Sequence, residues 1–462
     1  MKAPIIGKLM YSRIFIFICV VAIGSSFSAN AKDTLTDAMV YAYNTSGLLE
    51  QNRAVLRAAD EDVASAASQL APIVSWASTV SHSDRNLSSS FDTSASISLL
   101  ADFTLYDGGK RNLGVEAAKF SVFATRSSLV NIEQNVLFEA VKAYLEVIRE
   151  TENVSLREGN LSVISEELRA AKDRFQVGEI TKTDVALAEA RLAASNSALA
   201  FAKGSYEQAI ARYLSATGRK ANSLEYPVFI PEVPNSLEKA IAIALIEHPL
   251  IDELKNLVKV TEINSKIADL STGFTLSLGS SVSLDEDGET SGDLSLKASG
   301  PIFSGGKLYS SSRKQIALNE QVLARLYSSK ITIEQNVTNA FSLLQVAKAA
   351  KLAAEEQIKA TQVALRGVKE EATLGARTTL DVLNAEQELL DARVQLISAK
   401  VDEHLSLYRL LLQIGRLNAD YLNLPVRKYD VEEYYNLVKD SPASKTKKGR
   451  DLDKVLKSLK ID

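Results

Sequence analysis

Cysteine is almost absent from this 462-residue chain. The single one, Cys19, lies in a segment with the pattern of a cleaved secretory signal peptide, residues 1–31: basic residues, the apolar run "IFIFICVVAIG", then Ala29 and Ala31. That run is too short to cross a bilayer, which takes about 20 residues. A lipid-anchor role for Cys19 is the alternative, but its flank "FIC" lacks the small residue expected there. The mature chain then begins at Lys32 and contains no cysteine. This absence excludes disulfides, thiol nucleophiles and thiolate metal sites.

The chain also has few histidines and no positive net charge, and long apolar runs are missing after the signal. The three histidines, His82, His248 and His404, belong to different predicted elements, so they form neither a zinc site nor a catalytic triad. We therefore expect no enzyme activity, cofactor or metal. The net charge of −4, which becomes −7 when the three basic residues of the signal are removed, disfavours nucleic-acid binding. After the signal no run of 18 apolar residues occurs, which excludes a transmembrane helix.

Proline is missing from two long stretches, residues 73–226 and 302–424, and both are rich in strong helix formers. Each stretch predicts a helix of about 65–70 residues, roughly 100 Å long, that ends at a glycine and is followed by a shorter return helix. The predicted pairs are about 107–176 with 181–217, and about 305–374 with 378–415. In the last of these, apolar residues recur at steps of four and three, as in a coiled coil.

Before each long helix the sequence alternates between apolar and small polar residues. The alternating runs are "IVSWASTV" with "ASISLLADFTLY", and "FTLSLGSSVSL" with "LSLKASGPI", joined by the polar loops "SDRNLSSSFD" and "DEDGETSGD". We predict two β-hairpins, at about 73–105 and 274–303. Strands of about 9–11 residues with one apolar face are typical of transmembrane barrels; a soluble sandwich is the alternative. Trp76 and Tyr106 are expected either at the lipid boundary or in a packed core.

Four strands are too few for a closed barrel. About eight strands are the practical minimum, and unpaired strand edges are not tolerated in lipid. Several copies of the chain must therefore share one barrel: two copies would supply 8 strands and three would supply 12. Oligomerisation follows from this count, whereas the choice between two and three copies does not.

The chain is internally duplicated at an offset of 197 residues: "LYDGGKRN" recurs as "IFSGGKLY", and "VGEITKTDVALAEA" as "LGARTTLDVLNAEQ". The first repeat is 32–218 and the second is 236–425, each opening with a helix. A proline-containing linker, 219–235, joins them, and a lysine-rich polar tail, 426–462, follows, either solvated or wrapped around the waist of the molecule. Neither Gly-Gly-Lys fits a phosphate-binding loop. Both predict strand-to-helix turns, at Gly108, Gly109, Gly305 and Gly306.

This arrangement, duplicated behind a signal peptide, resembles the TolC family of outer-membrane efflux and secretion channels. The most specific segments are "LYDGGKRN", "IFSGGKLY", "FQVGEITKTDVALAEARL" and "TLGARTTLDVLNAEQEL", and the resemblance extends over about residues 34–424. It implies a mainly α fold with transmembrane β: a homotrimer whose chains contribute four strands each to a shared 12-stranded barrel. That barrel would lie in the outer membrane of a Gram-negative cell and continue as a long α-helical coiled-coil barrel.

The resemblance also implies a function. The trimer would be the exit duct of a tripartite efflux or type I secretion system, gated at its periplasmic tip. Its partners would be outer-membrane lipid, a periplasmic adaptor and an inner-membrane transporter, with no nucleic acid. The alternative is a structural or adhesive coiled-coil protein that transports nothing.

Candidate site residues cluster at the starts of the return helices. Thr181 with Asp184, and Thr378 with Asp381, have the spacing of capping boxes. By resemblance, Asp381 also takes the first position of an acidic aperture ring. The second ring position holds Asn384, which halves the expected charge.

Two further roles come from the resemblance. Thr183, Asp184 and Arg377 match positions of a latch that closes the tip, although Ala372 stands where the family has a latch tyrosine. An isolated Arg377–Asp184 surface pair is the simpler alternative, worth about 0–1 kcal/mol. The helical tips match adaptor contacts, or are merely tight turns: Val177, Gly178, Leu374 and Gly375.

Overall fold

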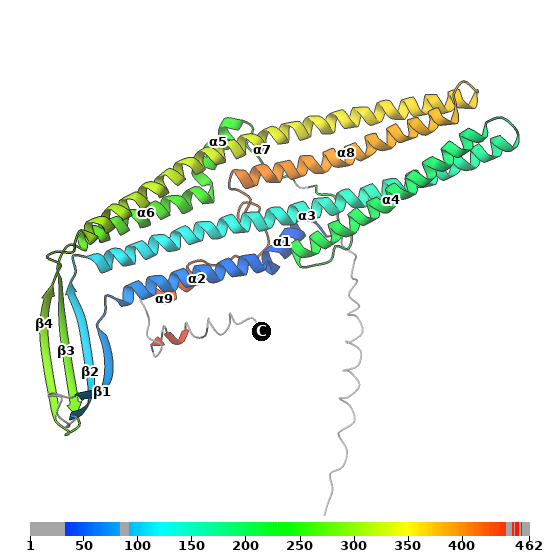
Figure 1. The fold of residues 1–462 in the computed structure, drawn as a ribbon. Helices are drawn as coiled ribbons and strands as arrows, with labels where there is room; N and C mark the ends of the chain where they lie inside the picture. Colours follow the sequence, from blue (N-terminus) through cyan, green and yellow to red (C-terminus); the bar gives the residue numbers. More distant parts are fainter. Residues whose placement is uncertain are drawn as a thin grey trace, which may run out of the picture.

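The structure is a computed structural model that describes residues 33–83, 92–228, 230–439, 446–447, 449–451 and 454. The predicted signal peptide, most of the first hairpin loop and much of the C-terminal tail lie outside these residues. Figure 1 shows a β-sheet at one end of an elongated molecule and two helical hairpins at the other. None of the helices in the described ranges combines the length and the apolar character needed to cross a membrane.

The elements form two matching series. The first is α1 (Leu35–Thr45), α2 (Gly47–Ser68), β1 (Ile73–Ser83), β2 (Asp92–Tyr106), α3 (Lys110–Gln176) and α4 (Lys182–Thr217). The second is α5 (Leu237–Glu247), α6 (Pro249–Leu270), β3 (Thr275–Asp285), β4 (Thr290–Ser299), α7 (Lys307–Thr373) and α8 (Thr379–Gln413), followed by α9 (Glu433–Val438). The long helices α3 and α7 have 67 residues each, or about 100 Å at 1.5 Å per residue.

Each repeat opens with two helices where the sequence predicted one. Both breaks fall on a residue with extended backbone: Ser46 has φ −66° and ψ 110°, and His248 has φ −69° and ψ 123°. The Ser46 hydroxyl accepts a hydrogen bond from the Leu49 N–H and so caps α2. Pro249 occupies the first position of α6, where its missing N–H costs nothing.

The four strands form one antiparallel sheet in the order β1-β2-β3-β4. The register gives the sheet two unlike faces, as the alternation predicted. On one face the hydroxyls of Ser98 and Ser283 are hydrogen bonded at 2.9 Å. On the other face Trp76, Leu99 and Val282 lie side by side across β1, β2 and β3. Within the described residues β1 and β4 each pair with one strand, so the sheet has two open edges.

The sheet departs from simple alternation at its helical end. A bulge between Thr104 and Tyr106 brings Tyr106 opposite Leu276, a position that strict alternation would give to Leu105. The Tyr106 and Phe274 rings then lie 5.2 Å apart. Strand β4 ends at Ser299, four residues before the predicted end at about residue 303, because Gly300 and Pro301 follow and proline cannot donate a ladder hydrogen bond.

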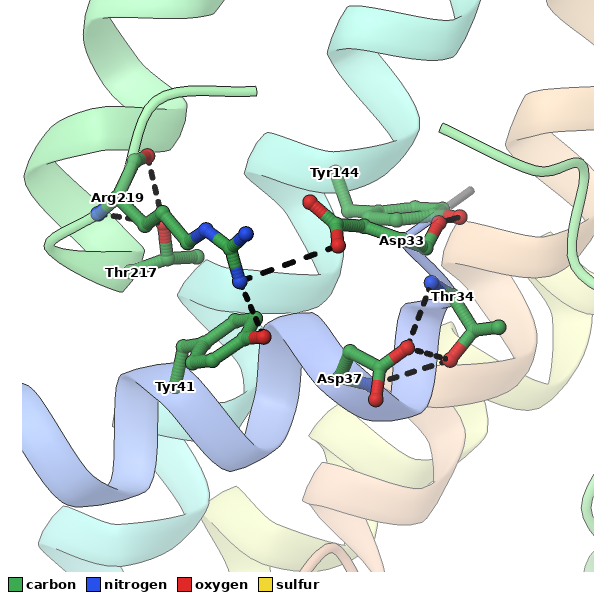
Figure 2. A network of polar contacts seen from close by, with 7 residues as sticks. All are labelled: Asp33, Thr34, Asp37, Tyr41, Tyr144, Thr217 and Arg219. Carbon is green, nitrogen blue, oxygen red and sulfur yellow. Dashed lines mark hydrogen bonds and ion pairs between the residues drawn. The ribbon is translucent and has the colours of Figure 1, made fainter. Parts of the chain in front are cut away.

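The core lies at the waist, where helices of both repeats meet, and Tyr144, Tyr213 and Tyr408 are its largest fully buried side chains. Figure 2 shows the polar network beside it, which ties the start of α1 to the linker. The Tyr144 hydroxyl is 2.9 Å from the Asp33 carbonyl oxygen and also hydrogen bonds to the Glu225 carbonyl. Arg219 donates to the Tyr41 hydroxyl and lies 4.0 Å from the Asp33 carboxylate.

The first part of the C-terminal tail packs along α2 and α3 instead of extending into solvent. The Tyr434 hydroxyl donates to Glu61 at 2.6 Å. The Arg126 guanidinium lies between two rings, 5.6 Å from the centroid of Phe123 and 5.2 Å from that of Tyr435. We call residues 426–439 the C-terminal strap, and Figure 1 shows its helix α9 beside α2.

Candidate gate at the helical tips

Both long helices end in the same glycine turn. In the first tip the Gly178 N–H donates to the Phe175 carbonyl and the Glu179 N–H to the Arg174 carbonyl, each at 3.0 Å, the pattern of a Schellman motif. Gly178 has φ +80° and Gly375, in the equivalent turn, has φ +77°. A Cβ at either position would meet no atom within 4 Å. Glycine is therefore required for its backbone conformation and not for space.

The return helices begin with the predicted capping boxes. The Thr181 N–H donates to the Asp184 carboxylate at 2.9 Å, and the Asp184 N–H donates back to the Thr181 hydroxyl at 3.3 Å. Thr378 and Asp381 make the same pair of bonds at 2.9 and 3.2 Å. Hydrogen bonds from the threonine side chain and backbone lower the pKa of both carboxyls, so both are ionised at neutral pH.

The corners of the tips present apolar side chains to solvent. Val177 is 71% exposed and Leu374 is 84% exposed. Neither helix needs an apolar residue at this position for its own packing. The expected adaptor contact at Val177, Gly178, Leu374 and Gly375 is compatible with this exposure and stays a prediction.

Two of the predicted latch residues, Arg377 and Asp184, make their polar contacts within their own hairpins. Arg377 forms an ion pair with Glu371, 2.7 Å from its Nε, and Asp184 is bonded to Thr181. Thr183 is exposed. Among the contacts of the described residues, none joins Arg377 to Asp184, and a latch made of these residues stays a prediction.

Three other residues do connect the two hairpins near their tips. The sequence analysis named Asn384 only as an aperture-ring position and missed Leu383 and Lys369. Asn384 on α8 accepts a hydrogen bond from Arg191 on α4 at 2.8 Å. Leu383 is 1% exposed and packs in a small apolar cluster formed mainly by α3 and α4. Lys369 on α7 lies 2.5 Å from Glu386 and 4.0 Å from Glu167 of α3. Spacing within one helix could not identify these residues, because it does not specify which face meets the other hairpin.

The strand-to-helix turns lie at the opposite end of the long helices. All four predicted glycines have positive φ there, +74° and +87° in the first repeat and +61° and +83° in the second. In the first repeat Arg111 adds a clamp: it donates to Asp107 at 3.0 Å, to the Gln69 carbonyl at 2.8 Å and to the Thr104 carbonyl at 2.5 Å. The second repeat has Leu308 at the aligned position and so lacks this clamp.

No group of three or more His, Cys, Asp or Glu side chains in the described ranges could hold a metal ion. The arrangement is therefore one of helix ends, interhelical contacts and an amphipathic sheet.

Comparison with known proteins decides the family of the chain. The family model described as "Outer membrane efflux protein" matches residues 42–219 and 268–416. The chain belongs to the outer membrane efflux protein family.

Relatives and solved structures agree with this membership. The outer membrane efflux protein BepC of Brucella suis biovar 1 is 35% identical over 420 residues, which cover 89% of this chain and 92% of BepC. The alkaline protease secretion protein AprF of Pseudomonas aeruginosa is 25% identical over 316 residues, 63% of each chain. The Campylobacter jejuni CmeC outer membrane channel matches the structure with a TM-score of 0.76 at 16% identity, covering 88% of this chain and 90% of CmeC.

The expected TolC-like fold and the outer-membrane location are thereby confirmed. The family and its structural neighbours are channel proteins and not enzymes. The comparisons place the chain among outer membrane efflux channels. One relative, AprF, is named as a secretion protein.

Proposed function

We propose that three copies of this chain form the exit duct of a tripartite efflux or type I secretion system. The duct is closed at its periplasmic tips and opens when a periplasmic adaptor and an inner-membrane transporter dock there. The observation that carries the proposal is a four-stranded sheet with two open edges, continued by two helical hairpins about 100 Å long.

The sheet has the surface of a segment of a membrane barrel. Trp76, Leu99 and Val282 are at least half exposed on one face, whereas small polar residues predominate on the other. In lipid the edges of β1 and β4 must be paired, and about eight strands are needed for closure. Three copies supply 12 strands, with the apolar face toward lipid and the polar face toward the lumen.

The long helices also leave apolar side chains uncovered in a single chain. Five of those on α7 are 63% exposed or more: Tyr309, Tyr327, Val346, Leu352 and Val363. Extended exposed apolar surface marks an interaction surface. Neighbouring copies around a common axis would cover it and form the helical tunnel.

The tip residues give the duct its gate and its docking points. Three copies of Asp381 would place three ionised carboxylates around the aperture, with the neutral Asn384 at the second position. Thr183, Asp184 and Arg377 remain the candidate latch that the family resemblance suggests. The exposed Val177 and Leu374 would be buried by the adaptor.

The cargo is decided outside this chain. BepC is named for efflux and AprF for protease secretion, so membership of the family does not by itself identify the cargo. A passive duct needs no reaction of its own, because the transporter supplies both the energy and the selection.

Stoichiometry tests the proposal. Native mass spectrometry of the mature protein in detergent is expected to give a mass three times that of the chain. A stable monomer, or a dimer alone, would contradict the proposed barrel.

Docking is tested separately. Leu374→Asp and Val177→Asp place charge on exposed corners, so we expect them to fold normally but to lose co-purification of the adaptor. Val228→Asp, at an 85% exposed position in the linker, is the matched control and should retain the adaptor. If all three variants retain the adaptor, the tips are not part of the docking site.

A further inference from the structure

We propose that an apolar contact holds the tip of this chain closed: Leu383 of α8 is seated against α3 and α4, and the Arg191–Asn384 hydrogen bond reinforces it. The proposal rests on the gating function proposed above and assigns the latch to residues other than Thr183, Asp184 and Arg377.

The Leu383 contact joins the two hairpins of one chain. Its cluster contains four other buried residues, Ile164, Leu168, Ala171 and Ala188, which belong to α3 and α4. Leu383 is the member from α8 and is almost fully buried, at 1% exposure, although the corners of the tips at Val177 and Leu374 are exposed. The cluster is separate from the core at the waist. Any motion that separates the hairpin tips must therefore bring this leucine into water.

The next residue makes the polar half of the contact. Asn384 accepts from Arg191 at 2.8 Å, and this bond runs from α8 to α4. The pairing also changes the electrostatics of the aperture, since the guanidinium of Arg191 lies beside the second ring position. Per chain its positive charge offsets the negative charge of Asp381, so we expect weak cation selectivity at this aperture.

The other polar groups at the tip do not require the opposite hairpin. Arg377 pairs with Glu371 on α7, and both side chains are half exposed. Asp184 and Asp381 cap their own helices. These contacts persist whether the hairpins are together or apart, so they cannot favour the closed arrangement.

A third link between the hairpins is an ion pair and contributes less than the Leu383 contact. Lys369 bridges Glu386 of α8 and, at 4.0 Å, Glu167 of α3. The lysine is 43% exposed, and exposed ion pairs contribute little. Burial of a whole leucine side chain contributes more, which is why the latch is assigned to Leu383.

The internal repeat shows that only the second hairpin carries the inserted leucine. At the offset of 197 residues, Leu383 aligns with Ala186 and Asn384 with Leu187. The first hairpin therefore lacks an equivalent leucine followed by asparagine. It supplies the apolar seat, and α8 supplies the inserted side chain.

Single-channel conductance in planar bilayers tests the inference. Leu383→Ala removes the inserted side chain, and we expect an increase in the open fraction of about tenfold or more. Leu380→Ala is the matched control: it makes the same change one turn earlier on α8, at a residue that is 37% exposed and outside the cluster. It should behave like the wild type. Conductance of Leu383→Ala at the wild-type level, or opening by Arg377→Ala without opening by Leu383→Ala, would overturn the assignment.

A cross-link covers the case in which Leu383→Ala does not fold. The only native cysteine is Cys19 in the predicted signal peptide, so Arg191→Cys with Asn384→Cys can be joined by a short bis-methanethiosulfonate reagent. Cross-linked channels are expected to open less often than the same double variant before cross-linking, and reduction should restore those openings. Conduction that is unaffected by the cross-link would contradict the latch while leaving the channel function intact. If neither the wild type nor any variant passed ions, the proposed function would fail as well.

Discussion

At the scale of the residue, Asp60 of α2 is a buried carboxyl group whose pKa is raised. It is 1% exposed on α2, and neither carboxylate oxygen accepts a hydrogen bond from the described residues. Burial raises its pKa to about 6, although Arg126 of α3 partly opposes the shift and Glu61 adds to it. Tyr429 and Tyr434 of the C-terminal strap also interact with this carboxylate. The ionised form is therefore unfavourable in the folded protein.

The sign of the pH dependence follows from that shift. A carboxyl whose folded pKa lies above its unfolded value of 3.8 binds its proton more tightly in the folded state. Stability is then lost as the pH rises from about 4 to above 6, by up to roughly 3 kcal/mol. We predict that Asp60→Asn raises stability at pH 7.5 and flattens this dependence, measured by hydrogen exchange in α2 and the strap at several pH values. An unchanged pH profile in Asp60→Asn would show that another group is responsible.

At the scale of the element, the sequence predicted what glycine, proline and alternation specify. Long proline-free stretches ended by Gly178 and Gly375 identified α3 and α7, and period-two runs identified the four strands. Tertiary contacts decide the rest. The bulge at Thr104 and the seat of Leu383 depend on neighbours far away in the chain, and a local pattern cannot encode them. The candidate latch residues Arg377 and Asp184 contact other residues of their own hairpins and not each other within the chain.

The orientation of the strands can be tested with the only tryptophan of the chain. Trp76 is 75% exposed on the apolar face of β1, so we predict a blue-shifted emission that brominated lipids quench strongly. The control is Trp76→Phe combined with Ala77→Trp, which moves the indole to the polar face. Equal quenching of the two proteins would mean that the apolar face does not contact lipid.

The glycine turns allow a comparison within α7. Gly375→Ala forces a Cβ into the left-handed region at φ +77° and should destabilise the tip by about 1–2 kcal/mol. Gly367→Ala lies inside the helix with open space around it, so it should stabilise by about 1 kcal/mol. Hydrogen exchange over residues 370–381 measures both effects, and changes of the same sign would contradict the turn assignment.

At the scale of the whole molecule, one physical requirement connects the parts. A sheet with one apolar face and two open edges is incomplete by itself, as are long helices with uncovered apolar side chains. Both would become complete in the proposed assembly of copies around one axis. The waist core, the linker network and the C-terminal strap connect the parts of the chain between the sheet and the hairpin tips.

The most direct test of this account is the current carried by the purified mature protein in a planar lipid bilayer. The account predicts discrete, uniform conductance steps, small because the tips are closed, that grow when Leu383 is replaced by alanine. The absence of any step from protein that is folded and inserted in the bilayer would contradict it.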